Sequence, residues 1–541
     1  MSRGASRHDN QGRRTRKREK PALRVSYLEE PKLIFGDQQE EPNPKLGLFN
    51  FGPYSVRDGA RHPTRIRLGI IGSGQTVADC KAWLSRIEEP IDPVGRARKQ
   101  VTPFPGFASD RGPFQSAFVV DQPCVRTLSD NEITAVTDIV DRRRAFEEGL
   151  KLLLTQIQMV AQDHHPAVII VALPQRLYDA CRAVGGPRDR SGQVKLTPAE
   201  RALQRLARRQ RKLRQALLFE DLYNVDSDQQ LIYRNFRRAL KARVMRWGVP
   251  IQIMRPRSFY DESAHAGLDD KLAALRRLAV QEPATRAWNF CSAMYFKAGG
   301  VPWRLAGIPG GTCFVGISFF RHDTVANPHM HTSLGQVFTD HGDALVVRGE
   351  RFEWDVARQG SPHLSPEHAH RLVETVICMY EQHVHAPPTR LIVHKSSRFT
   401  EDERSAFVQG IRASKVAYYD LVAIYPRGIR LFRAGTYPPA RGTLVQIPSG
   451  GELLYTMGYI PQLDTYPKGH VPKPIEIIER YGDSDLGTVC EEILGLTKLN
   501  WNSTDFAGAF PITLRFSRGV GDVLTELPDE DEPQPHYRFY I

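Results

Sequence analysis

Two stretches of the chain alternate short apolar runs with segments of helical periodicity, and this alternation constrains the fold more strongly than any other feature. The first stretch has apolar runs typical of buried strands at 66–71, 117–120 and 168–173, and a helical segment near 141–160. Strands that alternate with helices pack into α/β layers in which helices cover the sheet. We therefore predict an α/β protein whose first unit is Rossmann-like.

The second stretch begins near Gly310 and has a different order of elements. A strand pattern at 313–320 precedes a predicted strand pair at 335–338 and 344–347, turned by His341-Gly342-Asp343. The patterns that follow are helical at 366–382, strand-like at 390–394, helical at 401–412 and strand-like at 421–425. A hairpin followed by alternating helices and strands is the order of an RNase H-type sheet, and we predict that fold for the second unit.

The chain has 541 residues and a net charge of +13 that is concentrated in two places. Residues 1–20 carry eight Lys and Arg residues against two acidic ones, and residues 188–214 carry ten against two, so the rest of the chain is close to neutral. We predict a disordered basic tail over 1–22 and a basic helix over 197–217. Each is either a solvated surface or one that contacts a nucleic-acid backbone or, for the helix, an acidic partner.

The cysteine and hydropathy patterns exclude several classes of protein. The seven cysteines form no CxxC pair, which argues against a zinc ribbon and a disulfide framework and fits a reducing compartment. The longest apolar runs, such as Ala167–Leu173, are far shorter than a membrane-spanning helix, and the N-terminus has no apolar signal-peptide segment. We expect a soluble cytoplasmic protein with no membrane partner.

Four sequence motifs, in the expected order along the chain, resemble those of Argonaute proteins. They are the MID–PIWI junction (Asn289–Cys291 with Tyr295–Trp303), the first PIWI strand (Cys313–Ser318), the strand that carries the third catalytic residue (Arg390–Lys395), and the end of the PIWI domain (LTKLNWN at 496–502 with 510–515). The resemblance covers about residues 65–541. It is closest to the short prokaryotic Argonautes, because too few residues precede this region for the N and PAZ domains of long Argonautes.

The resemblance implies a Rossmann-like MID domain followed by an RNase H-like PIWI domain. The expected division of the chain is a basic tail over 1–22, an N-terminal strap over 23–64, the MID domain over 65–296 and the PIWI domain over 297–541. The strap consists of short strand-like pieces broken by Pro and Gly. We expect it to pack on a larger domain.

The resemblance places serine at two positions where active PIWI domains carry metal-binding aspartates. These are Ser318, which follows the Gly-Ile pair of the first strand, and Ser396, which follows His394-Lys395. Two-metal cleavage of a phosphodiester needs anionic oxygen ligands, and a neutral hydroxyl cannot replace them. Asp522 is the best match to the fourth position, but one carboxylate cannot hold a metal pair. The resemblance therefore implies a protein that is not an enzyme and has no catalytic residues of its own.

Two other functions remain open from the sequence. The first is an active guide-directed endonuclease, a slicer, in which nearby acids such as Asp323 or Glu401 act in place of the serines. Asp323 is expected outside the strand and Glu401 beyond the following loop, so the inactive interpretation is favoured. The second is a guide-independent nucleic-acid binder that uses the basic tail and helix.

A second group of residues matches the pocket in which MID domains hold the 5′-phosphate of a guide strand. Arg237 and Lys241 are four residues apart in a predicted helix and share a face, which suits the convergent binding of a phosphate. By resemblance, Gln252 and Lys297 complete this set. The resemblance also implies that the carboxylate of Ile541, together with Gln252, holds a Mg²⁺ ion against the phosphate.

Short Argonautes of this kind resemble guide-loaded sensors. The resemblance implies a bound guide RNA, a complementary single-stranded DNA target, and a partner protein in which an APAZ region is fused to a TIR, sirtuin-type or nuclease effector. Such a pair would act in prokaryotic defence against plasmids or phage. Because the recognition residues are present and the acids are not, the output is expected on the partner chain.

Overall fold

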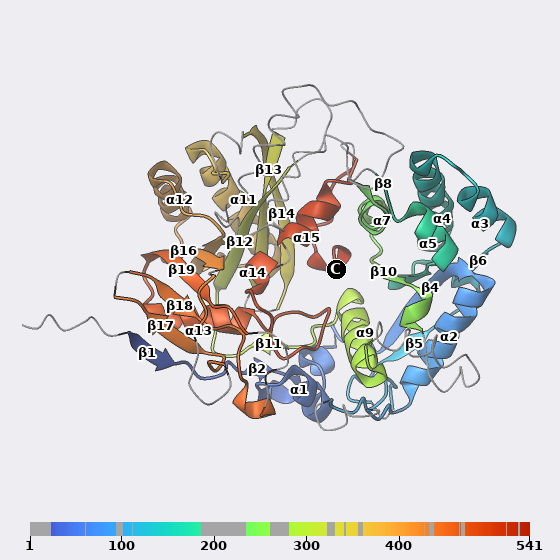
Figure 1. Ribbon diagram of the computed structural model, residues 1–541, viewed down its shortest axis with the longest axis horizontal. Coiled ribbons are helices and arrows are strands. Elements are labelled where there is room, and N and C mark those ends of the chain that lie inside the picture. Colours follow the sequence, from blue (N-terminus) through green and yellow to red (C-terminus); the bar gives the residue numbers. More distant parts are fainter. Residues whose placement is uncertain are drawn as a thin grey trace, which may run out of the picture.

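The computed structural model describes residues 23–59, 61–93, 101–110, 112–184, 234–259, 281–321, 330–339, 342–354, 361–426, 428–431, 438–448, 450–464, 466, 471–515, 517–528 and 531–541. These residues form two α/β units that lie side by side, and the C-terminus lies between them (Figure 1). The predicted basic tail and basic helix fall outside the described residues. Among the described helices, none combines the length and hydrophobicity needed to cross a bilayer.

The first unit is built on a parallel sheet in the order β10-β7-β4-β5, with β6 also paired to β4. Its strands are β4 (Arg65–Ser73), β5 (Ala117–Val119), β6 (Val125–Leu128), β7 (Val168–Ala172) and β10 (Ile251–Met254). Every residue of β7 is buried, because helices cover both faces of the sheet. Ile170 packs into the core on one face and Ile169 into the core on the other. The predicted Rossmann-like layer is confirmed.

The helices of this unit are α2 (Gly74–Glu88), α3 (Asp130–Thr137), α4 (Arg142–His164), α5 (Gln175–Cys181) and α7 (Phe236–Val244). Short elements connect them: η4 (Gln122–Cys124), β8 (Ala183–Val184), β9 (Arg234–Asn235), η5 (Met245–Trp247) and η6 (Pro256–Ser258). Phe146 of α4 meets Phe236 of α7 edge to face, with ring centroids 5.6 Å apart. This contact helps to seat α7 against the sheet beside β10.

The second unit is built on a nine-stranded mixed sheet in the order β1-β17-β18-β19-β16-β15-β12-β13-β14. Its strands are β1 (Arg24–Tyr27), β12 (Thr312–Arg321), β13 (Met330–Thr339), β14 (Ala344–Glu353), β15 (Arg390–Lys395), β16 (Tyr418–Pro426), β17 (Thr443–Gln446), β18 (Glu452–Leu454) and β19 (Ile475–Gly482). β12, β13 and β14 are antiparallel, and β15 and β16 run parallel to β12. This confirms the predicted RNase H order; the extension through β19, β18, β17 and β1 was not predicted.

Helices cover both faces of the nine-stranded sheet (Figure 1). α11 (Pro366–Val384) and α12 (Glu401–Ala413) cover one face, and α13 (Leu486–Leu496), α14 (Ile512–Arg515) and α15 (Ser517–Leu524) cover the other. The approach of α14 to β12 requires glycine at 316, because a Cβ there would lie 1.8 Å from the carbonyl oxygen of Thr513. α9 (Pro283–Lys297) joins the two units, and η9 (Tyr537–Phe539) ends the chain.

The N-terminal strap packs on the second unit. β1 pairs with β17, and β2 (Leu33–Ile34) pairs with both β3 (Glu40–Glu41) and β11 (Arg304–Leu305). The remaining short elements are η1 (Gly36–Gln38), α1 (Pro44–Phe51), η2 (Tyr54–Arg57) and η8 (Pro461–Leu463).

A buried ion cluster fastens the strap to the sheet. The carboxylate of Glu30 accepts hydrogen bonds from Arg441 Nε at 2.9 and 3.0 Å and forms an ion pair with Lys498 Nζ at 2.6 Å. Lys498 also donates to the carbonyl oxygens of Pro31 and Pro42, at 2.8 and 2.7 Å. The side chains of Arg441 and Lys498 are fully buried, and burial lowers the pKa of Lys498 to about 8. The lysine of the LTKLNWN motif therefore anchors the strap.

Replacing Glu30 tests this cluster. Glu30→Ala leaves two buried cations without their carboxylate, so we expect a loss of about 3 kcal/mol in the free energy of unfolding. Urea-induced unfolding, followed by tryptophan fluorescence, measures the loss. Glu29 is exposed and serves as the matched control. If Glu29→Ala and Glu30→Ala destabilise the protein equally, the cluster does not hold the strap.

Candidate functional site

Helix α7 presents two cations to the centre of the molecule. Asn235 caps the helix, since its side chain accepts hydrogen bonds from the backbone N–H groups of Arg237 and Arg238 at 3.1 and 3.4 Å. Phe236 and Leu240 are buried against the first unit. Arg237 and Lys241 lie one turn apart, as predicted, and Lys241 reaches across to the C-terminal segment.

Lys297, the last residue of α9, comes to the same place from the other side. It is 1% exposed, and its Nζ donates to the main-chain oxygen of Ile541. Lys241 Nζ donates to the carbonyl oxygen of Tyr540 at 3.2 Å. Figure 1 marks the C-terminus at the centre of the molecule, beside α7 and α9. The aromatic–aliphatic chain end is buried, and Ile541 is 7% exposed.

Burial and neighbouring cations lower the pKa values of all three residues. Burial, with a smaller contribution from nearby Arg237, lowers the pKa of Lys241 to about 7. Burial also lowers the pKa of Lys297 well below its usual value, and Lys241 and Arg237 add to this effect. Arg237 keeps an exposed edge, yet the surrounding protein and nearby Arg255 lower the pKa of its guanidinium.

The cluster of Arg237, Lys241 and Lys297, called the cation cluster below, has the character of an anion site. Across the part of the chain that the structure describes, no Asp or Glu side chain forms an ion pair with any of the three. A multiply charged anion such as a terminal phosphate would relieve their repulsion and accept hydrogen bonds from all three. The structure thus brings together three of the four residues predicted to bind phosphate.

Gln252, the fourth, lies on β10, against which α7 packs. Among the described residues, no hydrogen bond joins Gln252 to the cation cluster or to Ile541. The described residues also contain no group of three or more His, Cys, Asp or Glu side chains that could hold a metal. The amide oxygen of Gln252 and a terminal carboxylate are hard oxygen ligands of the kind that Mg²⁺ prefers. The Mg²⁺ site stays a prediction.

Ser318 lies on β12, and Ser396 directly follows the adjacent strand β15. The register pairs Ile317 of β12 with Lys395, the last residue of β15, so the two serines are the next residue along each chain segment. Ser318 is 7% exposed. Both positions lie at the centre of an RNase H-type sheet, where neighbouring acids would have to meet in order to share metal ions.

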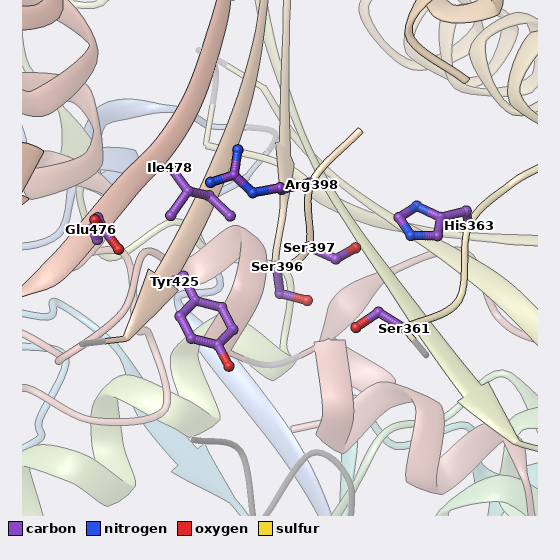
Figure 2. A pocket seen from close by; sticks show the side chains of 8 residues that line it. All are labelled: Ser361, His363, Ser396, Ser397, Arg398, Tyr425, Glu476 and Ile478. Atoms are coloured by element: carbon purple, nitrogen blue, oxygen red, sulfur yellow. The ribbon is translucent and has the colours of Figure 1, made fainter. Parts of the chain in front are cut away.

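A pocket of about 390 Å³ opens beside Ser396. It is lined by hydroxyl groups, two basic side chains, one acid and one aliphatic residue: Ser361, His363, Ser396, Ser397, Arg398, Tyr425, Glu476 and Ile478. Figure 2 shows the hydroxyl groups of Ser361 and Ser396 pointing toward one another across it. Arg398 is paired with Glu479 at 2.9 Å. The only acid among the residues that line this pocket is Glu476, on β19, a strand that sequence analysis had not assigned to the sheet.

A buried ion pair that sequence analysis missed lies behind this pocket. Lys395 Nζ contacts both carboxylate oxygens of Glu403, at 2.7 and 2.5 Å, and lies 3.1 Å from His363 Nδ1. The carboxylate also accepts a hydrogen bond from the Leu364 backbone N–H at 3.1 Å. The available signal was the Thr400-x-x-Glu403 pattern of a helix capping box, which the structure contains. The ion pair joins the end of β15, just before Ser396, to helix α12, which follows it. Through His363 and Leu364 it also holds the segment that precedes α11.

Asp522, the best match to the fourth catalytic position, lies in the second half of α15. Its carboxylate pairs with Arg238 of α7 at 2.5 Å. This ion pair therefore connects the two units. Glu401, the acid considered for an active enzyme, is exposed and pairs with Arg404 on its own helix. Asp323 lies outside the described residues.

Comparison with known proteins gives a likeness in structure only. No family model matches the sequence, and no curated protein matches it. The fold is similar to that of Clostridium butyricum Argonaute bound to a guide DNA and a 19-mer target DNA, with a TM-score of 0.59 and 12% identity over 94% of this chain and 54% of that one. It is also similar to Aa-Ago with externally bound siRNA, with a TM-score of 0.51 and 13% identity over 95% and 56% of the two chains. For A. aeolicus Argonaute the TM-score is 0.50 at 13% identity, over 95% and 55%.

These comparisons define the fold. The first unit corresponds to a MID domain and the second to a PIWI domain, as the resemblance implied. The chain spans about half the length of the Argonautes it matches.

The cation cluster predicts how anion binding depends on pH. With a pKa of about 7, Lys241 is increasingly neutral above that pH, while a phosphate monoester is already a dianion there (second pKa of about 6). Binding the dianion raises the pKa of Lys241, so the complex takes up a proton and affinity falls as pH rises above 7. Isothermal titration calorimetry with adenosine 5′-monophosphate, in buffers of different ionisation enthalpy, measures this uptake.

Lys241→Arg is the matched control for this titration. Its guanidinium stays charged over the whole range, so we expect the decline in affinity to be reduced. An affinity that is independent of pH in the unaltered protein would contradict the role given to Lys241.

Proposed function

We propose that this protein is a catalytically inactive Argonaute of the short prokaryotic type, which binds a 5′-phosphorylated guide, RNA by resemblance, and recognises complementary single-stranded DNA. The observation that carries the proposal is the cation cluster, because its three cations lie close together and no Asp or Glu side chain of the described residues pairs with them, so a multiply charged anion would stabilise it. Among the solved Argonautes of similar fold, one is bound to a guide DNA and a 19-mer target DNA, and another has externally bound siRNA. In this proposal the guide's 5′-phosphate is the ligand.

The proposal includes a Mg²⁺ ion beside the guide phosphate. Ile541 and Gln252 would hold it, and the ion would supply positive charge between the phosphate and the chain terminus. The Nζ atoms of Lys241 and Lys297 already donate hydrogen bonds to the main-chain oxygens of residues 540 and 541. The chain end and a guide phosphate would therefore share the same two donors.

The loss of cutting activity rests on the adjacent serines. Ser318 and Ser396 lack charge, and Asp522 is engaged by Arg238. This arrangement supports recognition without cleavage, because a metal pair needs several carboxylates around one phosphate. In the proposal, target recognition activates a partner that carries an APAZ region and a TIR, sirtuin-type or nuclease effector, in defence against plasmids or phage. Co-purification with the product of the adjacent reading frame tests that partner.

A cleavage assay separates this proposal from the alternative, an active slicer. We expect that protein loaded with a 5′-phosphorylated guide RNA retains a labelled complementary DNA but leaves it intact in Mg²⁺ or Mn²⁺, because two metal ligands are missing. Denaturing gel electrophoresis detects a cut, and a scrambled guide controls for contaminating nucleases. Cleavage at one guide-defined position would establish the slicer.

Charge reversal separates the proposal from guide-independent binding. Lys241→Glu with Lys297→Gln removes the phosphate donors, so we expect the preference for a 5′-phosphate over a 5′-hydroxyl RNA to disappear. Lys151→Glu alters an exposed lysine on α4 and is the control. Fluorescence anisotropy with the two RNAs measures the preference. Equal affinity for both RNAs in the unaltered protein, with a steep salt dependence, would favour guide-independent binding.

A further inference from the structure

The first turn of α7 carries charge of the wrong sign for a helix N-terminus. Arg237 and Arg238 occupy it, and it contains no acidic residue. The N-terminus of a helix bears partial positive charge, so anionic side chains stabilise it and cations do not. A capping box normally has Glu or Gln three residues after the cap, whereas here that position is Arg238. The first turn of α7 therefore has a capping asparagine but no acidic residue of its own.

The missing acids come from the PIWI domain. Glu526, just after α15, accepts a hydrogen bond from the backbone N–H of Asn235 at 2.8 Å, which is the bond that a capping-box glutamate makes. Its other carboxylate oxygen accepts from Arg234 Nε at 2.9 Å. Asp522 pairs with Arg238 at 2.5 Å. Glu526 is 8% exposed, so its own hydrogen bonds are largely shielded from water, whereas the Asp522–Arg238 pair is partly exposed.

The same segment of the PIWI domain then runs along α7 to the cation cluster. Arg246 pairs with Asp531 at 2.6 Å, and Gln534 Nε2 donates to the carbonyl oxygen of Met245 at 2.9 Å. The chain ends at residues 540 and 541, whose oxygens accept from Lys241 and Lys297. The segment 522–541 therefore fixes α7 at its start, at its end and at the phosphate donors.

We infer that Glu526 is a positioning residue for the guide 5′-phosphate, acting through the N-terminus of α7. The inference rests on the proposed function. Glu526 holds Asn235 and Arg234, and Asn235 in turn caps the turn that carries Arg237. Without this carboxylate the first turn frays, and Arg237 and Lys241 no longer face Lys297 in a fixed geometry. The phosphate pocket is thus assembled by both domains.

The experiment measures phosphate discrimination in the full chain. One labelled single-stranded RNA is prepared with a 5′-phosphate and with a 5′-hydroxyl, and fluorescence anisotropy gives the ratio of the two Kd values. Glu526→Gln keeps the shape of the side chain but loses its charge, and we expect the ratio to fall by about tenfold. Glu526→Asp retains the charge and is expected to recover part of the ratio. Affinity for the 5′-hydroxyl RNA should change little.

Glu147→Gln is the matched control. Glu147 is the more exposed partner of the same Arg234, with its side chain 47% exposed, and it does not cap Asn235. We expect this variant to keep the ratio of the unaltered protein. Hydrogen exchange of the α7 amides in the ligand-free protein should rise in Glu526→Gln and not in Glu147→Gln.

The possible outcomes distinguish a failure of the positioning role of Glu526 from a failure of the proposed function. If the unaltered protein prefers the 5′-phosphate and Glu526→Gln keeps the same preference, the positioning role is wrong and the proposed function stands. If the unaltered protein shows no preference, the proposed function fails, and the positioning role fails with it.

Discussion

The repulsion among Arg237, Lys241 and Lys297 is the constraint around which the centre of this molecule is organised. Burial lowers the pKa values of all three; Arg237 also lowers that of Lys241, and Arg237 and Lys241 lower that of Lys297. No Asp or Glu side chain of the described residues pairs with them. Holding like charges together costs free energy, so the surrounding structure must fix them in place. The two lysines donate hydrogen bonds to main-chain oxygens at the chain end, Lys241 to Tyr540 and Lys297 to Ile541. A site of this kind is poised to bind a multiply charged anion.

The rest of the structure supplies the rigidity that this site needs. α9 delivers Lys297 between the two domains, while α7 delivers Arg237 and Lys241 from the MID sheet. The PIWI segment that follows α15 crosses to α7 and contributes its cap. On the far side, Glu30 fastens the strap between Arg441 and Lys498. At both places a buried acid, Glu526 or Glu30, lies among cations of another segment of the chain. Removing one partner would leave an uncompensated buried charge.

Local patterns predicted the central strands of both sheets and several of the helices that cover them, because burial imposes its period on the sequence. The runs at 168–173 and 313–320 are strands within one or two residues of the predicted bounds, since both faces of these sheets are covered. The i,i+4 spacing of Arg237 and Lys241 also predicted their shared face. The extension of the PIWI sheet through β19, β18, β17 and β1 was missed, because its short strands are separated by long connections and pair with distant segments.

The sequence by itself determined the α/β class, the order of the two units, the basic face of α7 and the absence of acids at 318 and 396, because each of these depends on residue type and local spacing. Only the tertiary structure decided what Asp522 and Glu526 do. In sequence they are two acids near a short C-terminal helix; in space they complete the N-terminus of a helix nearly three hundred residues earlier, which lacks acids of its own. Chain folding sets such a pairing, because the hydrogen bond and the charge act over a few ångströms of space and not along the chain.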